Sequence, residues 1–265
     1  MFDRRLLLAA ALALAACGSK QEATPGNSTL SVAATAIPHA EILEHIKPAL
    51  SKQGIDLKVL VLNDFVQPNI QVAEGRVDVN YFQTKPYLDE FNANRSPKLV
   101  TIAEIHVEPL GGYSRKWKAL ADLPAGATVA IPNEGSNGGR ALALLARDGV
   151  ITLRPGAGAL ATPKDIITNP RNLQIKELEA ATLPRVLDQV DLALINTNYA
   201  LVAGLNPVRD ALIIESKNSP YVNYVVGLES ARTDPRVAKL VAALRSPDVK
   251  SFIEKKYGGA VISAF

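Results

Sequence analysis

The sequence is poor in the residues that most often carry redox chemistry, metal binding or catalysis. Its 265 residues include one cysteine and three histidines. One cysteine leaves no partner for a disulfide within the chain. His39, His45 and His106 stand at no metal-binding spacing such as H-E-x-x-H. We therefore expect no metal, no cofactor and no catalytic residues. The histidines should lie at the surface or support their neighbours, with His39 the most notable because it lies at a strand-to-helix turn.

Runs of like charge are also missing. The chain has 29 Lys and Arg residues against 26 Asp and Glu, mixed along its length, with a net charge of +3. A nucleic-acid-binding protein usually carries a basic stripe, so this composition argues against that class of partner. A hydrophobic share of 48% is enough for one large domain or for two lobes with cores of their own.

A long apolar run occurs at the N-terminus alone. Arg4 and Arg5 precede the apolar residues 6–16, which are followed by Cys17. This order is typical of a secretory signal, and the run is shorter than the roughly 20 residues of a membrane-spanning helix. Leu-Ala-Ala-Cys resembles a bacterial lipobox. We predict a cleaved leader (1–16), a lipid on Cys17, a polar tether (17–29), and anchoring to a membrane of the cell envelope, facing the periplasm or the exterior.

The chain from Leu30 alternates between strand-like and helix-like segments. Hydrophobic runs predict strands at 30–34, 57–62, 77–82 and 99–106, and helical spacing predicts helices at 39–53, 67–74 and 86–94. Such an alternation is typical of a mostly parallel sheet covered by helices.

Pro109–Gly112 interrupts this rhythm, and a second series follows. Strands are predicted at 128–131, 173–178, 191–195 and 221–228, and helices at 137–147, 235–244 and 247–257, with another break at Ser219–Pro220. We predict an α/β fold of two lobes, the first formed by 30–110 with 220–265 and the second by 111–219. A ligand cleft is expected between them, at the carboxyl ends of the strands.

The glycine-rich segment from Pro132 to Arg140 links a predicted strand to a predicted helix. Glycines allow a ligand close to the backbone, and a helix N-terminus attracts an anion. Arg140 can hold a carboxylate through two parallel hydrogen bonds. The segment is equally compatible with a plain turn that leaves Arg140 on a solvated helix face.

Aromatic and amide side chains follow several predicted strands. Strand ends line the cleft in such folds, so these residues are candidate ligand contacts, although each alone is also typical of a core aromatic, a turn or a cap. Tyr81 and Phe82 are adjacent, and both reach one pocket only if the chain turns there. The candidates are Phe65, Tyr81, Phe82, Asn196, Asn198 and Asn223.

Several blocks, in order along nearly the whole mature chain, resemble the methionine-binding lipoproteins of the NlpA type. This family supplies substrate-binding proteins to ABC importers. The resemblance implies a bilobal periplasmic-binding-protein fold, similar to type II, that closes on its ligand. The blocks are 38–43, 64–69, 80–83, 86–88, 137–142, 195–200 and 219–223.

The resemblance also implies roles for the candidate residues. Arg140 would hold the amino-acid carboxylate, the asparagines would hold the polar end, and the aromatics would surround the thioether. The family usually has a histidine where this chain has Thr84, which opens the question of the side chain that the pocket accepts.

The leading hypothesis is a monomeric substrate-binding lipoprotein that delivers L-methionine, or a related amino acid, to an ABC permease and its ATPase, without catalysis. One alternative is a periplasmic hydrolase of small amides or esters with Ser136 as its nucleophile, although no histidine is near in sequence. The other is a ligand-sensing or adhesion lipoprotein that keeps the fold and not the transport role.

Overall fold

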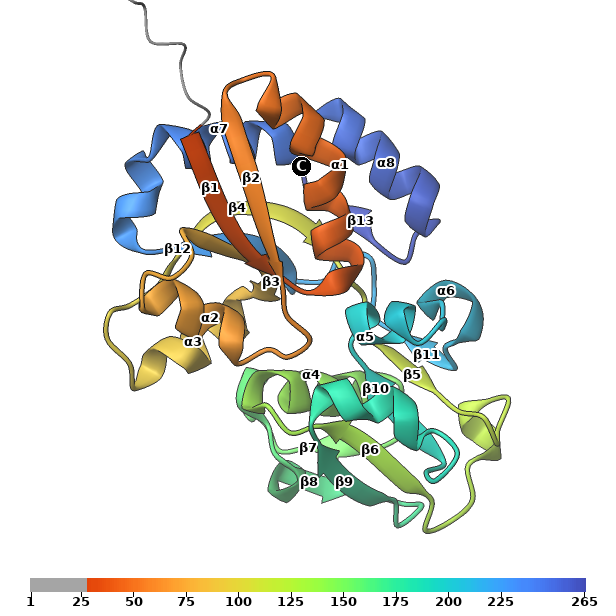
Figure 1. Cartoon of the computed structure of the whole chain (residues 1–265). Coiled ribbons are helices and arrows are strands. Elements are labelled where there is room, and N and C mark those ends of the chain that lie inside the picture. Colours follow the sequence, from red (N-terminus) through yellow and green to blue (C-terminus); the bar gives the residue numbers. More distant parts are fainter. Residues whose placement is uncertain (1–27) are drawn as a thin grey trace, which may run out of the picture.

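The computed structural model describes residues 28–265, which form two lobes joined on one side (Figure 1). The predicted leader, Cys17 and the tether up to residue 27 lie outside the described residues. No helix between Ser28 and Phe265 combines the length and the apolar character needed to cross a membrane.

The first lobe is built on a six-stranded sheet that mixes parallel and antiparallel pairs. β1 is parallel to both β2 and β3, whereas β12 lies between β3 and β4 and is antiparallel to both. In spatial order the strands are β13 (Ile262–Ser263), β4 (Val100–Val107), β12 (Val222–Gly227), β3 (Val79–Thr84), β1 (Ser28–Ala34) and β2 (Ile55–Val61).

The second lobe is built on a five-stranded sheet. β6 is parallel to β9 and β10, and β5 is antiparallel to β10 and β11. The spatial order is β11 (Ile213–Ile214), β5 (Gly111–Tyr113), β10 (Leu192–Ile195), β6 (Thr128–Pro132) and β9 (Gln174–Leu178), and a separate hairpin pairs β7 (Thr152–Leu153) with β8 (Ile166–Thr168).

The expectation of a mostly parallel arrangement is wrong for both sheets. β4 leads the chain out of the first lobe and β12 leads it back, so these two neighbours run in opposite directions. β5 and β11 likewise lie at the entry to and exit from the second lobe, and they pair antiparallel. The two passages between lobes therefore impose the antiparallel pairs.

Alternation along β1 divides the core of the first lobe into two layers. Leu30 and Val32 pack with the buried side of α1 (Glu41–Ser51), α7 (Pro235–Leu244) and α8 (Pro247–Tyr257). Ala33 packs instead with Val72 of α2 (Gln67–Ala73) and Leu88 of α3 (Lys85–Ala93). Because successive side chains of a strand point to opposite faces, helices cover both faces of this sheet (Figure 1).

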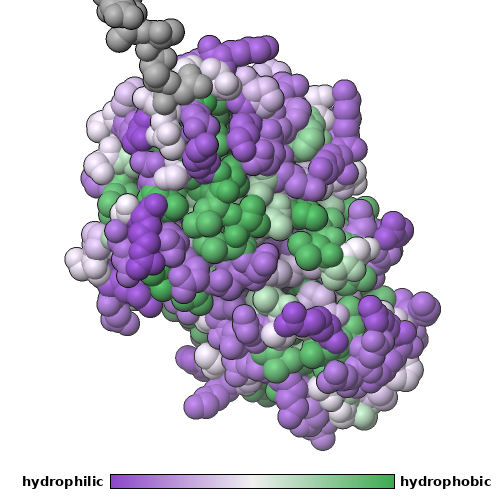
Figure 2. All heavy atoms as spheres, viewed as in Figure 1, coloured by the Kyte–Doolittle hydropathy of each residue, from purple (hydrophilic) through white to green (hydrophobic). Residues whose placement is uncertain are grey.

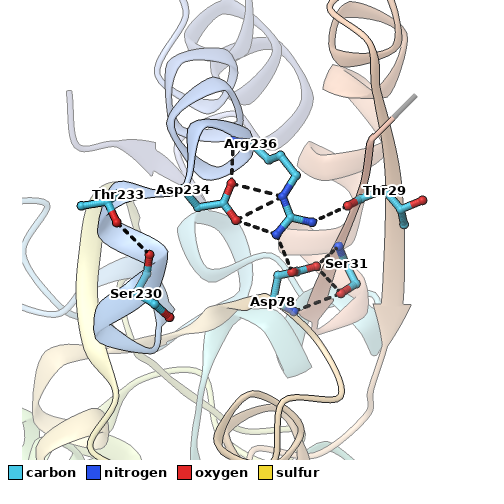
Figure 3. A network of polar contacts seen from close by, with 7 residues as sticks. All are labelled: Thr29, Ser31, Asp78, Ser230, Thr233, Asp234 and Arg236. Carbon is cyan, nitrogen blue, oxygen red and sulfur yellow. Dashed lines mark hydrogen bonds and ion pairs between the residues drawn. The ribbon is translucent and has the colours of Figure 1, made fainter. Parts of the chain in front are cut away.

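A polar network fastens the C-terminal helices to the start of the chain (Figure 3). Arg236, in the first turn of α7, donates to the Thr29 carbonyl at 2.6 Å and to Asp78 Oδ1 at 2.9 Å. The other oxygen of Asp78 accepts from the backbone and hydroxyl of Ser31, at 2.7 and 2.6 Å. Asp234 caps α7 through the backbone N–H of Arg236. Charge-assisted bonds of this kind hold α7 against β1.

The surface is mostly polar, with apolar areas on the first lobe near its junction with the second lobe (Figure 2). Exposed large apolar side chains of the first lobe include Leu60 and Val61 at the end of β2, and Val66 just before α2. In the second lobe, α4 (Gly135–Arg147) packs its buried leucines against β6 and β10.

Candidate functional site

A cavity lies where residues of the two lobes meet. The loops and strand ends of both lobes supply its wall, so a ligand there would touch both. The lining residues are His39, Phe65, Phe82, Gln83, Thr84, Tyr87, Glu108, Asn137, Arg140, Asn196, Thr197, Asn198 and Asn223.

One side of the cavity is aromatic. The ring centroid of Phe65 lies 5.9 Å from that of Phe82 and 5.9 Å from that of Tyr87. Tyr199, at the start of α5 (Thr197–Val202), brings its ring to 4.8 Å from Phe65. The Tyr87 hydroxyl donates to the Phe65 carbonyl at 2.8 Å, which fixes the loop that carries Phe65. Tyr87 was absent from the predicted ligand contacts, because nothing local distinguishes it from other helix-start aromatics.

Tyr81 does not line the cavity, which corrects its assignment as a ligand contact. β3 continues through Thr84, so Tyr81 and Phe82 point to opposite faces of the sheet. The Tyr81 ring is fully buried in the first-lobe core, and its hydroxyl donates to Nδ1 of His106. β3 continues for two residues beyond Phe82, so the chain does not turn between Tyr81 and Phe82 as one shared pocket would require.

Arg140 lies at the cavity with almost all of its side chain buried. Its Nε and Nη2 donate to the two carboxylate oxygens of Glu215 at 2.8 and 2.6 Å, and Nη2 also donates to the Glu108 carbonyl at 2.7 Å. Its guanidinium carbon lies 4.2 Å from the Tyr221 ring centroid. The two parallel hydrogen bonds expected for a ligand are thus made to Glu215. Within residues 28–265, Nη1 makes no hydrogen bond, so this nitrogen remains free to donate.

The N-terminus of α4 is not the ligand site that the glycine-rich segment predicts. Glu90 of α3 accepts from the backbone N–H groups of Gly135 and Ser136, at 3.0 and 2.9 Å. This carboxylate comes from the other lobe and occupies the positive end of the helix. Gly139 serves packing, because a Cβ there would lie 2.2 Å from the Ala159 carbonyl oxygen. The helix N-terminus therefore binds an anion of the protein itself.

The three predicted asparagines all line the cavity. Asn196 donates from Nδ2 to Asn137 Oδ1 at 3.1 Å, and its own buried Oδ1 has no partner among the described residues. Asn223 Oδ1 lies 3.1 Å from His39 Nε2, so its amide N–H groups remain for a ligand. A ligand that can both donate and accept would satisfy these amides.

A buried cluster of Glu108, His39 and His106 was not predicted from the sequence. Glu108 Oε1 lies 2.8 Å from His106 Nε2 and 3.3 Å from His39 Nε2. Thr35 Oγ1 contacts His39 Nδ1 at 2.7 Å. Both histidines are fully buried, so of the two expected positions, at the surface or in support of neighbours, they take the second. The sequence did contain one signal for Glu108 as a site residue. Glu108 follows a buried strand directly and precedes Pro109, at the first passage between the lobes.

The cluster has the side-chain types that could also hold a divalent cation, since its three donor atoms lie within 4.8 Å of one another. A cation would need both Nε2 atoms without protons. Hydroxyl donation from Tyr81 and Thr35 to the Nδ1 atoms instead leaves the ring protons on Nε2, where they point to Glu108. Hydrogen bonding satisfies the cluster without a metal.

Burial sets the protonation of this cluster. It lowers the pKa of His39 to about 4 and that of His106 to about 3, and it raises the pKa of Glu108. Burial disfavours whichever form is charged, so both imidazoles are neutral at pH 7. Hydrogen bonding from the Asn198 backbone and the positive charge of Arg140 act in the opposite direction on Glu108.

We expect the protein to lose stability between pH 7 and pH 5: the two histidines contribute a loss of about 3.5 kcal/mol, and Glu108 opposes part of it. An unfolded histidine takes up a proton as the pH falls below about 6.5, whereas His39 and His106 resist it until about pH 4 and pH 3. The unfolded state therefore gains protons in this window and becomes favoured. Denaturant unfolding at both pH values measures the loss, and His106→Asn should reduce it. Equal stability at pH 7 and pH 5 would contradict the buried, neutral state.

Ser136, the nucleophile of the hydrolase alternative, is buried beside the cavity. Its Oγ has no hydrogen-bond partner in residues 28–265. A serine nucleophile needs a base within hydrogen-bond reach, so the geometry gives this alternative no support.

Comparison with known proteins adds a full-length match. The family model described as NlpA lipoprotein matches residues 30–265. This chain belongs to the NlpA lipoprotein family. The methionine-binding lipoprotein MetQ of Bacillus subtilis is 42% identical to it over 267 residues, which cover 99% of this chain and 97% of the relative.

Two solved structures show the same fold as this NlpA lipoprotein. A nutrient binding protein from Burkholderia cenocepacia, bound to methionine, is 45% identical with a TM-score of 0.87, over 89% of this chain and 100% of the other. An ABC transporter periplasmic substrate-binding protein from Coxiella burnetii is 44% identical with a TM-score of 0.85, over 89% and 100% of the two chains. The predicted family and the bilobal periplasmic-binding fold are confirmed.

Thr84 is where this NlpA lipoprotein departs from the residue expected of its family. It ends β3, is largely buried and lines the cavity beside Gln83. Gln83 is held in place by Asn69 and Asn80. A short hydroxyl side chain at this point leaves more room than an imidazole would.

Proposed function

We propose that this NlpA lipoprotein captures methionine, or an amino acid of similar size, and delivers it to an ABC permease and its ATPase. The observation that carries the proposal is the division of the cavity. Phe65, Phe82 and Tyr87 form an apolar side, and Glu108, Arg140 and the asparagines form a polar side. A zwitterion with an apolar side chain matches both. The methionine in the Burkholderia structure supports the choice of ligand.

In this proposal the aromatic side receives the thioether. Sulfur-to-aromatic contacts stabilise by about 0.3–1.5 kcal/mol each. The free edge of Arg140 and the Asn223 amide receive the carboxylate, and the unpartnered Oδ1 of Asn196 accepts from the ammonium. Asn198, whose position on the cavity wall is next to Thr197, contributes a further amide.

Residues 30–110 with 220–265 and residues 111–219 would move as two bodies about the passages between them. A ligand favours closure only if it binds the closed state more tightly, and contacts to both lobes supply that difference. Cys17 would carry the lipid that holds the protein at the membrane, on the side away from the cytoplasm, within reach of the permease.

The test is the thermal midpoint of ligand-free protein, prepared by unfolding and refolding, against a panel of amino acids. A ligand at 100 times its Kd adds about 2.7 kcal/mol of stability, which for this size is a shift of about 5–10 °C. We expect such a shift with methionine. A shift with a larger amino acid alone would keep the transport role and make Thr84 the residue that changed specificity. No shift with any amino acid or methionine derivative would contradict the proposal.

A further inference from the structure

We infer that Glu108 is the counter-charge for the ligand's amino group, and that it restricts the cavity to ligands with a free, protonated primary amine. The inference rests on the proposed function, since it concerns the same cavity. Beyond the proposed function, it names the ligand group that is recognised by its charge, the amino group, and the residue that recognises it, Glu108.

The charges around the cavity are not balanced by the protein alone. Arg140 and Glu108 are the charged side chains among the lining residues. Glu215 already pairs with Arg140 through two hydrogen bonds. The carboxylate of Glu108 lies against the rings of His39 and His106 and is influenced by the positive charge of Arg140, but no lysine or arginine nitrogen of residues 28–265 lies within 4.0 Å of it. One negative charge therefore remains, buried and facing the cavity.

Burial raises the pKa of Glu108, and the hydrogen-bonding groups around it act against that effect and hold it in place. His106 Nε2 lies 2.8 Å from Glu108 Oε1 and Nδ1 contacts the Tyr81 hydroxyl, so a ring that donates from Nε2 to the carboxylate accepts from the phenol at Nδ1. Burial raises the pKa of Tyr81 well above its usual value, so this phenol stays a donor. The Asn198 backbone adds a further hydrogen bond to the carboxylate. Neutral donors hold the carboxylate without cancelling its charge.

A buried charge without an opposite partner is costly, and a ligand ammonium would remove that cost. An α-hydroxy acid of the same shape offers a hydrogen bond and no charge. An N-acyl amino acid has no charge on its nitrogen and is bulkier there. Hydrogen bonds to charged groups are worth more than neutral ones by an amount that corresponds to roughly 5- to 30-fold in affinity. The cavity should therefore separate amino acids from the matching hydroxy acids by about this factor.

The experiment compares L-methionine with its α-hydroxy analogue by calorimetry on the unaltered protein and on Glu108→Gln. We expect the unaltered protein to prefer L-methionine roughly 5- to 30-fold. Glu108→Gln keeps the size and the hydrogen bonds to the histidines, and should reduce the preference to about threefold or less, mainly by weakening L-methionine. Glu108→Asp keeps the charge and should retain the preference at lower affinity. Glu104→Gln is the matched control, because Glu104 lies on β4, the strand directly before Glu108, and accepts from the Tyr224 hydroxyl at the surface.

Each outcome decides between roles for Glu108. An undiminished preference in Glu108→Gln, or an equal loss of affinity for both compounds, overturns this inference and leaves the proposed function standing. Failure of the unaltered protein to bind either compound overturns both. If Glu108→Gln does not fold, loss of the preference in Glu108→Asp would overturn the inference, and its retention supports it.

Discussion

Replacing Arg140 with alanine is expected to abolish ligand binding and to destabilise the protein by about 3–5 kcal/mol. The loss of stability follows because Glu215 and Glu108 would remain buried without their cationic neighbour. The loss of binding follows because the free guanidinium edge is the positive group on the cavity wall. Calorimetric titration and denaturant unfolding measure the two effects separately.

Two further variants separate binding from folding. Arg147 lies on the same helix, exposed and paired with Asp148, and Arg147→Ala should change neither quantity by more than about 0.5 kcal/mol. Arg140→Met combined with Glu215→Leu removes both charges and should recover most of the stability while binding stays lost. Full affinity in Arg140→Ala would show that the carboxylate of the ligand is held elsewhere.

Replacing Glu90 with glutamine is expected to weaken ligand binding by about 10-fold. Glu90 bonds two backbone N–H groups at the start of α4 across the lobes, so these bonds exist only while the lobes are together. Hydrogen bonds to a charged group contribute about 1.5–3 kcal/mol, and exposure of this pair to solvent reduces that amount. Less stabilisation of the closed state means a lower apparent affinity.

Solution scattering provides a second reading of the same variant. The radius of gyration of ligand-free Glu90→Gln should exceed that of the unaltered protein, because open molecules become more frequent. Asp89→Asn, one residue earlier on α3 and paired with Lys85 within the same helix, is the control and should leave both the radius and the affinity unchanged. An unaltered radius together with an unaltered affinity would rule out a role of Glu90 in closure.

The sequence predicted the long elements well, because burial leaves a local pattern. The apolar spacing of Ile42, Leu43, Ile46 and Leu50 places the buried side of α1, and the run 57–62 places β2. β5, β11 and β13 have two or three residues each, and they exist because other strands pair with them. Such short strands carry too little pattern to be predicted before the sheet is known.

The sequence predicted site residues whose own chemistry marks them as candidates, and it missed contacts that depend on a partner residue elsewhere in the chain. Phe65, Phe82 and Arg140 lie on the cavity as expected. Arg140 is engaged by Glu215, 75 residues away in the same lobe, and the α4 N-terminus is engaged by Glu90 of the other lobe, so both contacts depend on the tertiary fold. Glu108 likewise gains its character from His106, two residues earlier, together with His39 of a distant segment. No local spacing records the contacts with Glu215, Glu90 and His39.

The position of β12 has a consequence for the order in which the protein folds. β3 and β4 are consecutive along the chain, yet β12, at residues 222–227, lies between them in the sheet. During synthesis the first sheet therefore lacks the strand between β3 and β4 until the last fifth of the chain has emerged. The strands of the second sheet are all available earlier. Because non-local pairings form slowly, the first lobe should stay incomplete until β12 and, after it, β13 have been synthesised.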